Sequence, residues 1–159
     1  MTAFKPSWQA VLAILLCLAA IVFGAMTQPE TDALANPAAT IAYPYLGTKS
    51  LLVGLLIVAA IVSMLRIPGA AKAVVLFAGA HGAAWLLIHG IGGFEGTAKA
   101  PYYLVLAAGW LLGWLCVAEL SALRPASRGA ANLLRLAIPA IFGAWILILW
   151  EAITRGAGV

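Results

Sequence analysis

The feature that most constrains this chain is a series of five long stretches in which apolar residues follow one another almost without interruption. These stretches cover residues 8–26, 50–65, 73–92, 102–123 and 136–153. About 20 consecutive apolar residues are needed for an α-helix to cross the hydrocarbon core of a bilayer. The pattern therefore predicts an all-α, polytopic membrane protein with five transmembrane helices.

The composition supports this prediction and excludes a soluble domain. The chain of 159 residues is 65% hydrophobic and only 9% charged, with a mean hydropathy of +1.07. Soluble domains are about 45–50% apolar and about 25% charged. The net charge of +4 is spread over termini and loops rather than gathered in a run. The charge therefore indicates membrane topology, and no nucleic-acid partner is predicted.

The first apolar run has two interpretations. A lysine, Lys5, precedes it, as in a secretory signal peptide. The run is long for a signal peptide, however, and Phe23 before Ala25 makes a poor cleavage site, so we expect an uncleaved first helix. The polar stretch that follows contains prolines that exclude a continuous helix. Within it, residues 38–42 are apolar enough to lie on the bilayer surface.

Basic residues predict the orientation. The stretch 124–135 carries three arginines and no acid between two apolar runs, which is typical of a cytoplasmic loop. An N-terminus inside the cell places six of the nine Lys and Arg on the cytoplasmic side. These six are Lys5, Arg66, Lys72, Arg124, Arg128 and Arg135. We therefore expect a cytoplasmic N-terminus and a periplasmic C-terminus in a bacterial inner membrane. The expected organisation is a four-helix block (1–123), a basic cytoplasmic connector (124–135), and a fifth helix with its tail (136–159).

The two histidines are the candidate cofactor-binding residues. His81 and His89 both lie in the third apolar run. On a helix, a spacing of eight residues separates them by about 80° and about 12 Å, so they cannot share one metal ion or sandwich one haem. Ionisable groups inside a membrane are functional candidates. We expect structural imidazoles that are hydrogen-bonded to nearby backbone or hydroxyl groups. The alternative is a haem or quinone site that a partner chain completes.

The other polar residues of the apolar runs predict structural roles. Cys17 and Cys116 are expected to be small buried hydrophobes rather than a disulfide. Glu119 is expected to form an interfacial ion pair with Arg124 or Arg128. The chain has no phosphate-binding glycine loop and no cluster of metal ligands, so no enzymatic activity and no metal site are predicted.

Small residues four positions apart predict close helix contacts inside a membrane. Such pairs are Gly79 and Ala83, Ala78 and Gly82, and Gly109 and Gly113. They predict that the third and fourth helices pack tightly against each other. Trp110 and Trp114 share one face of the fourth helix, and we expect them to fill a groove of the bundle.

The last 27 residues, 133–159, have a more specific pattern, in which a basic residue precedes an apolar helix with a polar end. The residues that carry the pattern are Leu149, Trp150, Glu151, Arg155, Gly158 and Val159. The segment resembles the first transmembrane helix of permease subunits of nitrate/taurine-type ABC importers. The in-to-out direction expected for this helix from the charge count agrees with that family.

The resemblance implies a non-catalytic, integral membrane component of a transporter. It would be the N-terminal part, or an accessory membrane region, of an ABC importer permease, with the lipid bilayer and other membrane subunits as partners. The transport core would then follow Val159. Two alternatives remain. One is an accessory subunit of a membrane redox or pigment complex that uses His81 or His89. The other is a five-helix receptor similar to the tryptophan-rich sensory family, whose Trp-x-Pro-Pro-x-Trp pattern is absent.

The packing of the fifth helix is expected to distinguish these possibilities. The first helix of a transport core would contact the four-helix block sparsely, with the basic connector as a tether. A helix of a complete five-helix bundle would pack along its whole length. The small residues that would allow this are Ala137, Ala140, Gly143 and Ala144. In either case, Pro139 removes one backbone donor and is expected to bend the helix.

Overall fold

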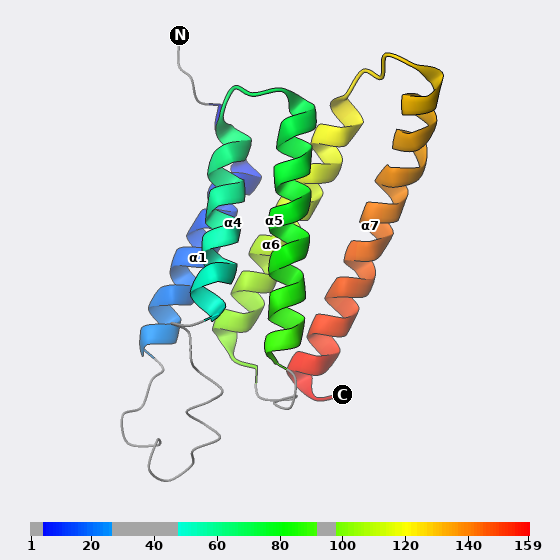
Figure 1. The fold of residues 1–159 in the computed structure, drawn as a ribbon. Coiled ribbons are helices and arrows are strands. Elements are labelled where there is room, and N and C mark those ends of the chain that lie inside the picture. The colour runs from blue at the N-terminus through cyan, green and yellow to red at the C-terminus, as the bar shows by residue number, and fades with distance from the viewer. Residues whose placement is uncertain (1–4, 27–47, 92–97) are drawn as a thin grey trace.

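The computed structural model describes residues 5–26, 48–91 and 98–159, and every element within these ranges is an α-helix (Figure 1). The helices are α1 (Trp8–Met26), α4 (Thr48–Met64), α5 (Gly69–Gly90), α6 (Ala100–Ala122) and α7 (Arg128–Ala157). The all-α prediction is confirmed. The short surface helix expected at 38–42 lies outside the described residues.

Successive helices run in opposite directions, so that the described chain passes up and down through one bundle (Figure 1). The start of α1 and the connections α4–α5 and α6–α7 lie at one end, which we call the basic end because it carries Lys5, Arg66 and Arg124. The C-terminus lies at the other end. Three helices, α5, α6 and α7, are long and apolar enough to cross a membrane, and α1 and α4 contain shorter apolar stretches.

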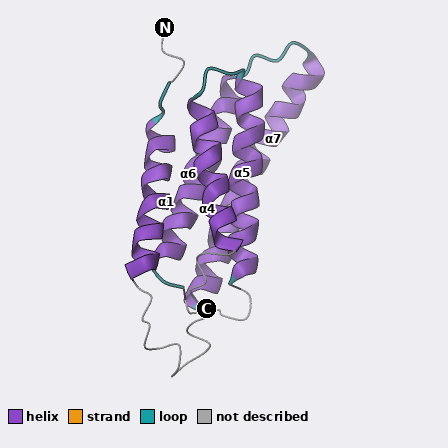
Figure 2. Cartoon of the chain, turned by 60° about the vertical axis from the view of Figure 1, so that its left-hand side comes forward, coloured by secondary structure: helices purple, strands orange, loops and turns teal. Residues whose placement is uncertain are grey.

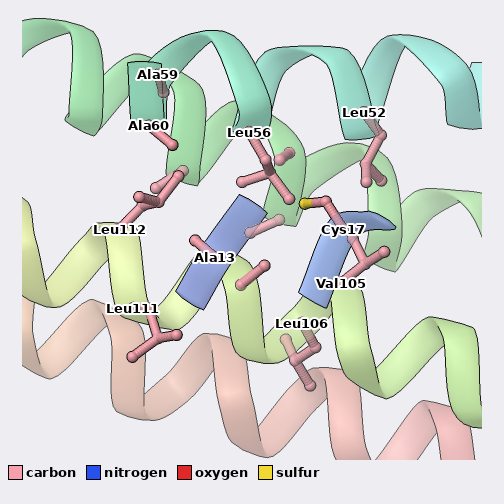
Figure 3. Close-up of a cluster of buried hydrophobic side chains, with 14 of the residues drawn as sticks. Ala13, Cys17, Leu52, Leu56, Ala59, Ala60, Val105, Leu106, Leu111 and Leu112 are labelled. Carbon is pink, nitrogen blue, oxygen red and sulfur yellow. The ribbon is translucent and has the colours of Figure 1, made fainter. Parts of the chain in front are cut away.

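The core lies between α1, α4, α5 and α6, which together form the four-helix block. It is built largely from alanines and leucines, with both cysteines among its fully buried side chains. In Figure 3, Ala13 and Cys17 of α1 lie between Leu56 of α4 and Val105 of α6. Small side chains on α1 allow the neighbouring helices to approach closely, as in membrane bundles in general. Cys17 and Cys116 are free and buried, as expected for small hydrophobes.

Two of the small-residue pairs serve contacts other than those expected. A Cβ atom on Gly79 of α5 would lie 2.6 Å from the Cβ of Ala59, so this glycine allows α5 to pack against α4. Gly109 and Gly113 of α6 face α7 instead of α5. Helices α5 and α6 are neighbours, as expected, and Ala83 and Ala84 of α5 lie beside Val105 and Leu106 of α6.

Helix α6 contacts the first two turns of α5 at the basic end. The Cys116 thiol donates a hydrogen bond to the carbonyl of Ala73, with a Sγ–O distance of 3.3 Å. The Glu119 carboxylate lies beside Gly69, the first residue of α5. A negative charge is favourable there because the N-terminus of a helix carries a partial positive charge. Among the described residues Glu119 forms no ion pair, so the expected pairing with Arg124 or Arg128 is wrong.

Helix α7 begins at Arg128 rather than at residue 136, so the expected connector is mostly helical. Ser127 caps this helix because its hydroxyl accepts a hydrogen bond from the Ala130 N–H at 3.2 Å. The helix runs through Pro139 and ends at Gly158, whose left-handed backbone (φ 75°) allows its N–H to bond to the Thr154 carbonyl at 2.8 Å. Its 30 residues span about 45 Å, which exceeds the roughly 30 Å of a hydrocarbon core.

Candidate functional site

The candidate site lies at the contact between α6 and α7, where a tryptophan is buried. Its centre is Trp145, which is 2% exposed and is one of only three buried residues of α7. The indole lies flat on two glycines of α6. A Cβ on Gly109 would lie 3.3 Å from the Cη2 atom of the benzene ring, and a Cβ on Gly113 would overlap the Nε1 edge. The two glycines therefore form the seat of this tryptophan.

A second contact fixes the C-terminal end of α7. The Tyr102 hydroxyl donates a hydrogen bond to the carbonyl of Ala152, with an O–O distance of 2.9 Å. Gly156 lies so close to α6 that a Cβ atom there would be 2.9 Å from the hydroxyl of Tyr103. The carbonyl of Gly156 also accepts a hydrogen bond from the Ala98 N–H at 3.3 Å. The C-terminal half of α7 is therefore docked on the start of α6.

The N-terminal half of α7 makes no comparable contact. Figures 1 and 2 show α7 close to α6 near the C-terminus and separated from it at the basic end. The small residues that would line a continuous interface in a complete five-helix bundle do not form one. Ala140 is exposed, and a Cβ atom on Gly143 would meet nothing within 4 Å. Helix α7 is thus a peripheral helix, attached to the four-helix block along half of its length.

A crevice of about 290 Å³ opens where α6 and α7 diverge. Its lining residues are Trp110, Gly113, Trp114, Val117, Phe142 and Trp145. We expected Trp110 and Trp114 to fill a groove within the bundle, but they are 38% and 44% exposed and form one wall of this crevice instead. The ring of Trp114 also contacts Trp8 of α1 edge-on, with centroids 5.6 Å apart. Through this contact, α1 supports the Trp114 side chain in its position in the crevice wall.

Two polar atoms in this region are buried and have no hydrogen-bond partner in the described structure. They are the indole Nε1 of Trp145 and the imidazole Nε2 of His81, whose rings lie 5.4 Å apart. The Nδ1 of His81 lies 2.9 Å from the carbonyl of Phe77. A carbonyl only accepts, so Nδ1 is the donor there and Nε2 carries a lone pair. A buried donor or acceptor left without a partner costs about 1–3 kcal/mol.

The two histidines do not share a site. His81 is half-buried and stacked on Phe77 with centroids 4.2 Å apart, on the side of α5 that faces Trp145. His89 is exposed near the end of α5, and its ring lies over Trp85 with centroids 3.7 Å apart. Within the described ranges, no group of histidine, cysteine and acidic residues is placed to hold a metal ion.

The residues that carry the C-terminal pattern build the end of α7. Glu151 and Arg155, one helical turn apart, form an ion pair, and Gly158 supplies the left-handed cap. Trp150 is 71% exposed near this end. These positions therefore terminate a transmembrane-length helix with polar and aromatic groups, as expected at a membrane interface.

Sequence reasoning singled out Gly109, Gly113, Trp110 and Trp114 but assigned them to other contacts, and it missed Trp145. The available signal was a tryptophan in the middle of an apolar helix, far from the interfacial positions that this residue prefers. A search of protein families, of curated proteins and of solved structures finds nothing that matches this chain.

Proposed function

We propose that the chain is a non-catalytic membrane component of a transporter, formed by the N-terminal part or an accessory membrane region of an ABC importer permease. The observation that carries this proposal is the half-attached helix α7. Its C-terminal half is docked through Trp145 and Ala152, while most of its length is exposed. The same segment has the sequence that resembles the first transmembrane helix of such permeases.

In this proposal the chain crosses the bacterial inner membrane five times, with the basic end in the cytoplasm. The helices α1 and α4 have 19 and 17 residues, which lies within the range of roughly 17–25 for a transmembrane helix. Lys5, Arg66, Lys72 and Arg124 all belong to the basic end, in agreement with the tendency of cytoplasmic segments to be rich in Lys and Arg.

The four-helix block then acts as a membrane-embedded support that holds α7 from one side. The opposite side of α7 is available for further transmembrane helices. Gly143 lies on that side, and its open surroundings would allow another helix to approach closely. In this proposal, ATP is hydrolysed by a separate ATP-binding subunit, and the block positions the first helix of a transport core.

A matched pair of substitutions tests this proposal. Gly143→Leu places a large side chain on the free side of α7, and Gly54→Leu does the same on α4, where a Cβ atom also meets nothing within 4 Å. Neither change disturbs a contact within the described chain. We expect the affinity-tagged natural protein to co-purify, in mild detergent, with an ATP-binding subunit that carries a nucleotide-binding glycine loop.

Gly54→Leu should leave this co-purification unchanged, and Gly143→Leu should reduce it several-fold. Quantitative mass spectrometry of the purified complexes gives the ratio of the two subunits. The proposal is wrong if the unsubstituted protein brings down no ATP-binding subunit, or if both variants retain it equally.

A further inference from the structure

The crevice between α6 and α7 extends from the middle of the bundle toward the basic end. Trp110 is the eleventh of the 23 residues of α6, and Trp145 lies close to the middle of α7. Tryptophans of membrane proteins are enriched at the membrane–water interface, where the indole N–H can reach water. Here, Trp110 lies about 15 Å from the start of α6, and the crevice continues from it to Val117, about 8 Å from the end of the helix.

The two walls of the crevice are apolar and largely aromatic. One stripe of α6 contributes Trp110, Gly113, Trp114 and Val117, whose spacing keeps them on a single face of the helix. Phe142 of α7 stands opposite and is 52% exposed. Among the described residues, no charged side chain lines the crevice, so an ionic ligand would lose its hydration without compensation. Flat aromatic surfaces instead favour a neutral, flat molecule.

The floor of the crevice offers one hydrogen-bond donor. The benzene edge of Trp145 lies over Gly109, and its N–H edge lies over Gly113. Gly113 lines the crevice, whereas Gly109 lines a separate small pocket on the other side of the indole. The unpartnered N–H of this nearly fully buried residue is therefore turned toward the crevice. A donor in this position matches an acceptor oxygen on the ligand.

We propose that this crevice binds a neutral, lipid-soluble molecule with a flat ring and a carbonyl oxygen, of the kind found in membrane quinones, which enters sideways from the bilayer. Its carbonyl accepts the hydrogen bond of Trp145, and its ring lies between Trp114 and Phe142. The volume of about 290 Å³ is at the lower end of the range of ligand sites, which suits one ring system and not a large cofactor. The proposal concerns binding alone and is independent of the function proposed above.

Binding requires a small movement, because the indole nitrogen is covered in this conformation. The contact at Gly113 must open slightly before an oxygen atom reaches the N–H. The part of α7 before Ile141 is mostly exposed, so it can move with little loss of packing. The hydrogen bond of Tyr102 keeps the C-terminal half in place during this movement.

The test uses two flat probes with the same carbon skeleton, 2-methyl-1,4-naphthoquinone, which has two carbonyl oxygens, and 2-methylnaphthalene, which has none. Each is titrated into the natural protein in lipid nanodiscs by calorimetry, with empty nanodiscs subtracted. We expect saturable binding of the quinone, with an affinity about five- to tenfold higher than that of the hydrocarbon, as one hydrogen bond supplies. Absence of saturable quinone binding, or equal affinities for the two probes, overturns the proposal in favour of a groove for lipid chains.

Substitutions at Trp145 and Val117 test whether the probes bind in this crevice. Trp145→Phe removes the N–H, and Trp150→Phe is the matched control at a 71% exposed position of the same helix. Trp145→Phe should erase the preference for the quinone, and Trp150→Phe should leave it intact. Val117→Phe fills the crevice and should abolish binding of both probes, whereas Val58→Phe, at a 57% exposed position of α4, should not. Unchanged quinone binding in Val117→Phe refutes the site even if Trp145→Phe does not fold.

Discussion

The substitution Gly113→Ala tests whether Trp145 attaches α7 to the four-helix block. In the structure, the added methyl group would overlap the Nε1 and Cε2 atoms of the indole and lie 2.8 Å from Cδ1. Gly113 is buried in the middle of α6, so neither its own backbone nor the block behind it can readily give way. The indole must therefore leave its seat or tilt away from α6.

The expected cost follows from the size of this overlap. Inserting an extra methyl or methylene group into a well-packed core costs about 1–3 kcal/mol. In an unobstructed helix position, alanine is favoured over glycine by roughly 0.5–1 kcal/mol. The two effects oppose each other, so Gly113→Ala should destabilise the protein by a net amount of about 0.5–2 kcal/mol. Gly82→Ala, on the neighbouring helix α5 where a Cβ atom meets nothing within 4 Å, should be neutral or stabilising.

Reversible unfolding of the protein in mixed micelles, followed by circular dichroism, measures both free energies of unfolding. A double variant adds a specific check. Trp145→Phe removes the atoms that the methyl group overlaps, so Gly113→Ala should cost much less in that background, which gives a coupling energy of about 1 kcal/mol or more. The reasoning is refuted if Gly113→Ala is as stable as Gly82→Ala, or if the cost is the same with phenylalanine at position 145.

Three further predictions concern other parts of the chain. Tyr102→Phe removes the hydrogen bond to α7 and should lower the free energy of unfolding by about 0.5–1.5 kcal/mol, and an unchanged value would exclude an anchoring role. Cysteines at Glu95 and Arg128 should be labelled from opposite sides of intact spheroplasts, whereas labelling from the same side would contradict the proposed topology. His81→Ala and His89→Ala should leave the visible spectrum of the purified protein unchanged, and a Soret band that is lost in either variant would instead indicate a haem subunit.

The start of α7 shows where sequence reasoning misplaced a boundary. The arginines between Arg124 and Arg135 were interpreted as a loop because basic residues are typical of cytoplasmic connections. The local signal for a helix was nevertheless present, since Ser127 is a favourable cap and Gly129 is followed by good helix formers. Charge thus predicted the end of the bundle at which these arginines lie, and the capping serine determined where the helix begins.

The candidate site shows a different limit. Gly109 and Gly113 were recognisable as a place of close approach, but their expected partner was α5 and the observed partner is Trp145 of α7. In a soluble helix, the polar residues would mark the side that faces solvent, and the remaining side would have to be packed. Helices that are apolar on every side have no polar face, so their sequence does not show which side is packed against a neighbour.

By itself, the sequence determined the helical architecture, the approximate position of most helices and the end of the bundle that collects the basic residues. These properties follow from the length of apolar runs and from the distribution of charge, both of which can be counted along the chain. Only the tertiary structure decided that α7 is docked through one half, that Trp145 lies on two glycines, and that a crevice opens above it. Inside a membrane, lipid and protein are equally apolar, so the choice between them depends on the fit of side chains in three dimensions.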